Sequence, residues 1–187
     1  TTAVLIDEGG ERSFAHCVGA PEKLDREFFL DRIEHFAASR MMLLGYYSLM
    51  PNVQQDLAEV FAEIRKQGCL TALDAAGDGG SMQPLDAILP HLDIYVPSHA
   101  EATNQTGRTD PREIIGVFRD QGAAGLLGVK LGAAGALLQT SGGCWIDVEP
   151  VLPPGEIVDT TGAGDSFYAG LLTGLLRGMD EAAAGRL

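Results

Sequence analysis

Hydrophobic residues follow two alternating patterns along most of the chain. From about residue 28, stretches with apolar residues three and four positions apart, which predict amphipathic helices, alternate with short apolar runs, which predict buried strands. The predicted helices cover residues 29–37, 57–67, 99–105, 114–118 and 163–177, and the predicted strands cover 41–44, 69–73, 92–96, 126–131, 136–139 and 144–148. This repetition of strand and helix predicts a mainly parallel sheet with helices on both faces.

Two segments depart from this alternation and predict antiparallel hairpins. Residues 136–139 and 144–148 flank the turn formed by Ser141, Gly142 and Gly143. Near the N-terminus, residues 4–6 and 13–18 flank Gly9-Gly10, and this pair is expected to form a flap over the sheet.

The length and the ends of the chain limit its organisation. With 187 residues, the chain is long enough for one domain or for part of a larger one. It begins at Thr1 without a methionine, inside a strand-like run, and closes at Leu187 in a helix-like pattern. We therefore expect a fragment of a longer protein.

Charge and composition limit the classes of molecule that the protein is expected to bind. The chain has 26 acidic and 13 basic residues, a net charge of -13 and a pI near 4.5, so its field repels nucleic acid. No apolar run is long enough to span a membrane, so no membrane partner is expected. The three cysteines are scattered without metal-ligand spacing, which favours a reducing compartment and a cytoplasmic location.

The segment with the most chemical information is Asp159–Phe167, which reads DTTGAGDSF. Its small residues precede a predicted helix, where consecutive backbone N–H groups form an anion site. Asp165 lies inside this turn and is well placed as a general base for a hydroxyl that attacks a bound phosphoryl group. The alternative is an ordinary helix N-terminus whose carboxylate matches the helix dipole.

Other candidates follow predicted strands, where ligands of open α/β sheets bind. The residues that follow strands or strand-like runs, and are expected to line one crevice, are Asp74, Pro97, Ser98, Gly132 and Asp159.

Two competing nucleotide-binding motifs are not present in the sequence. A dinucleotide-binding oxidoreductase is disfavoured because Phe167 stands where that fingerprint needs a third glycine, and no Walker A triplet occurs in the chain.

The segment DTTGAGDSF resembles the C-terminal signature of the ribokinase-like (PfkB) carbohydrate kinases. Residues 95–102 resemble that family's PNxxE segment, with Ser98 in place of the usual Asn, and residues 129–136 resemble its TLGxxG nucleotide loop. Asp74 resembles the acidic residue that ends a central strand. The resemblance implies a three-layer α/β ribokinase-like fold, with residues 1–187 as one partial kinase domain and residues 1–20 as lid strands.

The resemblance also implies roles for particular residues. Asp165 would be the catalytic base, and the amides of Gly162, Ala163 and Gly164 would form an anion hole for the transferring phosphoryl group. Glu101 would order Mg²⁺ through water, and Asp159 and Thr161 would help to bind a monovalent cation such as K⁺. The nucleotide-binding residues would be Ser98, Lys130, Gly132, Gly135, Gly164 and Asp165.

The resemblance implies transfer of the γ-phosphoryl group of ATP to a hydroxyl of a sugar or nucleoside, and a homodimer formed through the lid is compatible with it. Because Ser98 is shorter than the family's usual Asn, either a water is expected to bridge the gap or nucleotide and metal binding is expected to be weaker there. The family's N-terminal sugar-gripping segment has no counterpart in this chain, so a non-catalytic nucleotide-binding remnant is the alternative. His16, in the lid, is either a surface residue or one that faces a sugar.

Overall fold

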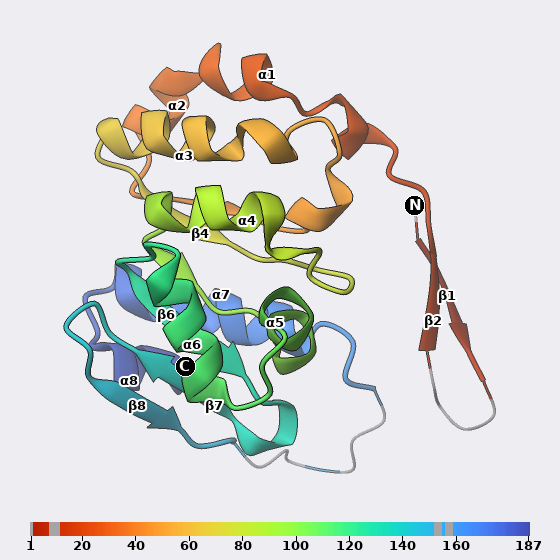
Figure 1. Cartoon of the computed structure of the whole chain (residues 1–187), viewed down its shortest axis with the longest axis vertical. Coiled ribbons are helices and arrows are strands. Elements are labelled where there is room, and N and C mark those ends of the chain that lie inside the picture. Colours follow the sequence, from red (N-terminus) through yellow and green to blue (C-terminus); the bar gives the residue numbers. More distant parts are fainter. Residues whose placement is uncertain (1, 8–11, 152–154, 156–158) are drawn as a thin grey trace.

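The central sheet has six strands in the order β3-β4-β5-β6-β7-β8 (Figure 1). The computed structural model describes residues 2–7, 12–151, 155 and 159–187. Strands β3 to β6 are parallel, and β7 and β8 extend the sheet as antiparallel neighbours, which confirms the mainly parallel prediction. The strands are β3 (Met41–Leu44), β4 (Leu70–Leu73), β5 (Ile94–Tyr95), β6 (Leu126–Lys130), β7 (Ala136–Gln139) and β8 (Trp145–Val148).

Helices cover both faces of this sheet and form a three-layer arrangement. Successive strand residues point to opposite faces, so Leu73 and Tyr95 enter the core beneath one helical layer while Ala72 and Ile94 enter the core beneath the other. The first layer contains α1 (Arg26–Leu30), α2 (Ile33–Ala37), α3 (Leu57–Lys66), α4 (Met82–Ile88), α5 (His99–Thr106) and α6 (Pro111–Asp120), and the second contains α7 (Ala163–Leu176) and α8 (Glu181–Gly185).

The predicted helix over residues 29–37 is wrong as a single element. The chain forms α1 and α2 instead, because Arg32 leaves the helical conformation at φ −120° and ψ 25°. The Arg32 guanidinium donates to the carbonyl of Phe28 at 3.0 Å, which supplies a partner at the end of α1.

Helix α4 was not predicted, since the extended backbone of Gln83 and the following Pro84 interrupt any helical pattern.

The N-terminal hairpin is confirmed as an antiparallel pair. Strands β1 (Thr2–Ile6) and β2 (Arg12–His16) form a two-stranded sheet of their own, with Val4 opposite Phe14. The predicted Gly9-Gly10 turn lies outside the described residues. The hairpin stands away from the main body in Figure 1, where residues 17–25 join it to α1.

No helix in the described part of the chain has both the length and the apolar character needed to cross a membrane.

Candidate active site

The parallel strands bring several polar residues to one edge of the sheet. Tyr46 and Asp74 follow β3 and β4, and Ser98 follows β5 as the N-cap of α5. Lys130 ends β6, and its backbone N–H donates to the Pro97 carbonyl at 2.8 Å, which holds it beside Ser98. Residues from four separate parts of the chain therefore meet at this edge of the sheet, and the crevice predicted there stays a prediction.

Helix α7 begins at this edge with a left-handed glycine. Gly162, at φ 80°, is the N-cap residue, and a methyl group added there would meet no atom within 4 Å. Just before it, the carboxylate of Asp159 accepts the N–H of Thr161 at 2.8 Å. The backbone at Gly162 is therefore open to the approach of another group, as an anion site requires.

Asp165 lies in the first turn of α7 and is exposed. The phenol of Tyr46 donates a hydrogen bond to its Oδ2 atom at 3.3 Å. Burial and the negative charge of Asp165 raise the pKa of Tyr46 above its ordinary value, so this phenol keeps its proton at neutral pH. The carboxylate thus faces solvent with a neutral hydroxyl beside it.

The Ala163 amide is already engaged in this structure. Its N–H donates to the Thr160 carbonyl at 3.1 Å, in the turn that precedes α7. A contribution from Ala163 to an anion hole would require that this bond be shared or opened, whereas the backbone at Gly162 faces open space.

Lys130 places a positive charge beside the α7 turn. Its Nζ atom donates to Asp74 Oδ1 at 3.1 Å, and the two side chains are only 14% and 12% exposed. A methyl group added at Gly164 would lie 3.4 Å from the same Nζ atom. Burial raises the pKa of Asp74, although the ammonium group opposes the shift. The pair supplies a fixed cation close to the expected anion site.

Glu101 is buried and bonded to backbone on two sides. Its Oε1 atom accepts the N–H of Ala76 at 3.0 Å, and its Oε2 atom accepts the N–H of Ser98 at 2.7 Å. The Ser98 hydroxyl accepts the Glu101 N–H in return, which completes a capping box. Glu101 therefore ties α5 to the loop after β4, in addition to the metal-ordering role that the resemblance implies.

The two glycines of the predicted nucleotide loop have different surroundings. Gly132, at φ 60°, is exposed, and a methyl group added there would meet nothing within 4 Å. At Gly135, at φ 86°, an added methyl group would lie 2.0 Å from the Val148 carbonyl. Packing against β8 thus explains Gly135 without a ligand, while Gly132 leaves open backbone.

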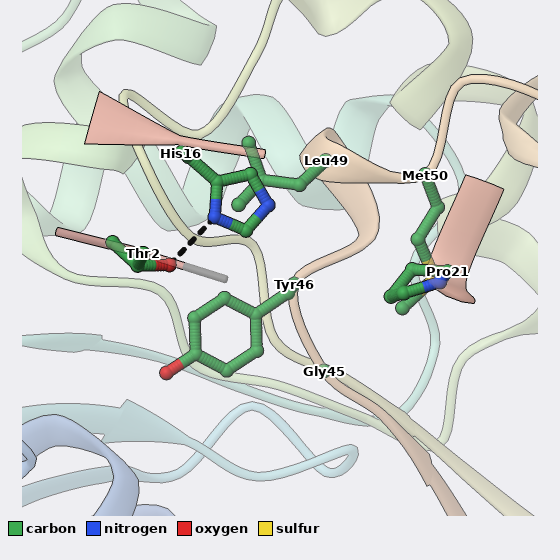
Figure 2. Close-up of a pocket in the computed structure, with 7 residues that line it drawn as sticks. All are labelled: Thr2, His16, Pro21, Gly45, Tyr46, Leu49 and Met50. Carbon is green, nitrogen blue, oxygen red and sulfur yellow. Dashed lines mark hydrogen bonds between the residues drawn. The ribbon is translucent and has the colours of Figure 1, made fainter. Parts of the chain in front are cut away.

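A cavity of about 320 Å³ lies between the hairpin and the loop after β3. Figure 2 shows the Tyr46 ring beside Thr2 and His16, whose side chains are joined by a hydrogen bond of 2.7 Å. The remaining lining residues are mostly apolar: Pro21, Gly45, Leu49 and Met50. The cavity brings His16 next to the residue that contacts Asp165.

The sequence analysis missed Tyr46. Its place just after β3, on the same edge as Asp74, was a usable signal, because the carboxyl ends of parallel strands meet there.

Within the described ranges, no group of three or more His, Cys, Asp or Glu side chains is arranged to hold a metal ion. The roles expected for Glu101 with Mg²⁺, and for Asp159 and Thr161 with a monovalent cation, stay predictions.

Comparisons with known proteins place this geometry in a family. Over residues 1–187, the sequence matches the pfkB family of carbohydrate kinases. It is 34% identical over 138 residues to a 1-phosphofructokinase from Rhodobacter capsulatus, covering 70% of this chain and 42% of that protein. An uncharacterized sugar kinase from Archaeoglobus fulgidus is 29% identical over 203 residues, covering 100% of this chain and 72% of that protein.

Solved structures share the fold. The structure of Arabidopsis thaliana ribokinase complexed with ribose and ATP superimposes with a TM-score of 0.82 and 25% identity. That match covers 99% of this chain and 59% of the ribokinase chain, so the chain spans little more than half of that relative. A probable sugar kinase from Rhizobium etli superimposes with a TM-score of 0.83 at 21% identity, over 100% of this chain and 56% of that one. The chain described here belongs to the pfkB family of carbohydrate kinases.

Proposed function

We propose that the protein containing this chain transfers the γ-phosphoryl group of ATP to a hydroxyl of a sugar or sugar-like substrate. The observation that carries the proposal is the exposed carboxylate of Asp165 in the first turn of α7, beside the open backbone of Gly162 and the ammonium of Lys130. A base, an anion site and a cation are the parts that phosphoryl transfer uses.

The residues of this edge fit the phosphates of a nucleotide. The open backbone at Gly162 and Gly132 allows close approach, and the Lys130 side chain lies beside Gly164. We assign the phosphates to these residues and the deprotonation of the acceptor to Asp165. When bound, ATP supplies the phosphoryl group and Mg²⁺ offsets its charge.

Asp165 accepts the proton of the acceptor hydroxyl. The freed oxygen forms its bond to phosphorus while the bond from that phosphorus to the bridging oxygen of ADP breaks. Lys130 and the amides of the α7 turn stabilise the charge on the transferring group. The hairpin lies across the cavity from Tyr46, where it would exclude water from the reacting groups.

We also propose sites for Mg²⁺ and K⁺. Mg²⁺ usually keeps several waters and binds through one or two carboxylates and the phosphates of its substrate, which suits a water-mediated contact from Glu101. Asp159 and Thr161 are the candidates for K⁺. A cytoplasmic location and a homodimer stay predictions from the sequence.

The test compares Asp165→Asn with the wild type in the complete protein. The expected result is a loss of sugar-dependent ADP formation of about 10²–10⁴-fold, since a general base contributes that much. ATP affinity, measured by titration calorimetry, should stay close to that of the wild type. Asp147→Asn, at an exposed carboxylate on β8, is the matched control and should keep both properties.

Near-normal turnover in Asp165→Asn would show that the role of Asp165 is wrong. If the wild type bound ATP but formed no ADP with any of a panel of sugars, nucleosides and sugar phosphates, the non-catalytic remnant would be supported instead.

A further inference from the structure

Tyr46 holds an unusual backbone conformation. Its φ of 61° and ψ of 34° lie in the left-handed region, which costs energy for a bulky side chain. Among the described residues, the other non-glycine with positive φ is Ala76, at φ 79°, just after β4. Both outliers lie at the sheet edge that carries Asp74, and such strain is concentrated where side chains must be held for function.

The neighbouring tyrosine has very different surroundings from those of Tyr46. Tyr47 is 2% exposed, and its hydroxyl donates to the Gly79 carbonyl at 3.2 Å. Tyr46 is 49% exposed, yet its hydroxyl reaches Asp165, which lies 119 positions further along the chain. A ring that adds so little to the core is better explained by what its hydroxyl and its faces contact.

The Tyr46 ring also bounds the cavity between the hairpin and the body. Thr2 and His16 line the hairpin side, and Leu49 and Met50 extend the apolar wall (Figure 2). One side chain therefore connects the largely apolar cavity to the carboxylate. A ring in this place can cover the C–H face of a sugar while the hydroxyl of that sugar meets Asp165.

We propose that Tyr46 is a positioning residue for Asp165 and a wall of the acceptor site, an inference that rests on the proposed function. Its hydroxyl donates to Oδ2 and fixes the carboxylate, which leaves Oδ1 to take the acceptor proton. Its ring contributes to acceptor binding. The hydroxyl thus acts on turnover and the ring acts on acceptor affinity, so the two contributions are separable by substitution.

Two substitutions in the complete protein separate these contributions. Tyr46→Phe should lower kcat about 10-fold, the value of one hydrogen bond to a charged group, while the acceptor KM changes less than about twofold. Tyr46→Leu removes the ring as well and should also raise the acceptor KM. Tyr47→Phe is the matched control: it should lower the thermal midpoint while leaving kcat and KM unchanged.

A third substitution distinguishes positioning from a structural role. Asparagine adopts the left-handed region more readily than tyrosine, so Tyr46→Asn should keep or raise the thermal midpoint while it lowers kcat. Unchanged kcat and KM in Tyr46→Phe, or a lowered midpoint in Tyr46→Asn, would overturn the inference. If Asp165→Asn is inactive and Tyr46→Phe is fully active, the inference alone fails. If Asp165→Asn is active, the proposed function fails with it.

Discussion

Helices α5 and α7 begin at the same edge of the central sheet, yet their first turns are built differently. The start of α5 is closed, because Ser98 and Glu101 cap each other and the Glu101 carboxylate also binds the loop after β4. The start of α7 is open, because Gly162 has no side chain to cap it, and the carboxylate of Asp165 faces solvent.

The difference separates two uses of a carboxylate at a helix N-terminus. At α5, backbone N–H groups are satisfied within the protein, so the carboxylate stabilises the fold. At α7, the exposed carboxylate and the open glycine backbone remain accessible to a substrate. Equivalent substitutions at the two helix starts should therefore change different quantities.

The largest effect on stability is expected for Lys130, which lies between the two helix starts. Lys130→Met leaves Asp74 buried without its cation, and we expect a loss of about 3 kcal/mol in the free energy of unfolding, measured by urea denaturation at neutral pH. The double variant Lys130→Met/Asp74→Asn should recover most of the loss, because no unpaired charge remains. ATP affinity should be lower than that of the wild type in both the single and the double variant. Full ATP affinity in the double variant would exclude Lys130 from the nucleotide site.

A smaller effect is expected at Glu101. Glu101→Ala leaves the N–H groups of Ala76 and Ser98 without their acceptor, which should cost about 2 kcal/mol of unfolding free energy. Asp165→Ala is the matched change at α7 and should cost about 1 kcal/mol, since the interactions lost there, a helix-dipole interaction and the hydrogen bond from Tyr46, are exposed to solvent. Equal losses in the two variants would remove the distinction between a closed and an open helix start.

The N-cap of α5 gives a still smaller expected effect. Ser98→Ala removes the hydroxyl that accepts the Glu101 N–H at 3.3 Å, and about 1 kcal/mol of stability should be lost. Ser98→Thr keeps a capping hydroxyl and should be close to the wild type. A loss in Ser98→Thr as large as in Ser98→Ala would show that the hydroxyl is not what stabilises this helix start.

The smallest effect is a pH dependence that originates at Asp74. Burial raises its pKa from the ordinary value of 3.8, so the folded protein holds this proton more tightly than the unfolded chain. The associated stability is present below pH 3.8 and is lost as the pH rises through the raised pKa. As the pH rises, the unfolding free energy of the wild type should therefore fall relative to that of Asp74→Asn. A constant difference across that range would contradict the assigned shift.

The sequence by itself determined most of the elements, because apolar periodicity is a local property. The strand Met41–Leu44 lies where it was predicted, and α7 ends within one residue of its predicted end. The break between α1 and α2 was not predictable from periodicity, since the apolar spacing continues across Arg32 while its backbone leaves the helical conformation. Helix α4 was missed because its local backbone contradicts a regular helical pattern.

The motif around Asp165 was also recognisable from the sequence, since its small residues and its carboxylate are adjacent in the chain. Its surroundings were decided by tertiary structure alone. Tyr46 meets Asp165 across 119 positions, and the Lys130 ammonium binds Asp74 across 56 positions. Neither contact has a local signature, because each depends on the parallel strands bringing their carboxyl ends together. Periodicity fixes which face of a strand is buried, but the packing of the sheet and helices decides which side chains share its edge.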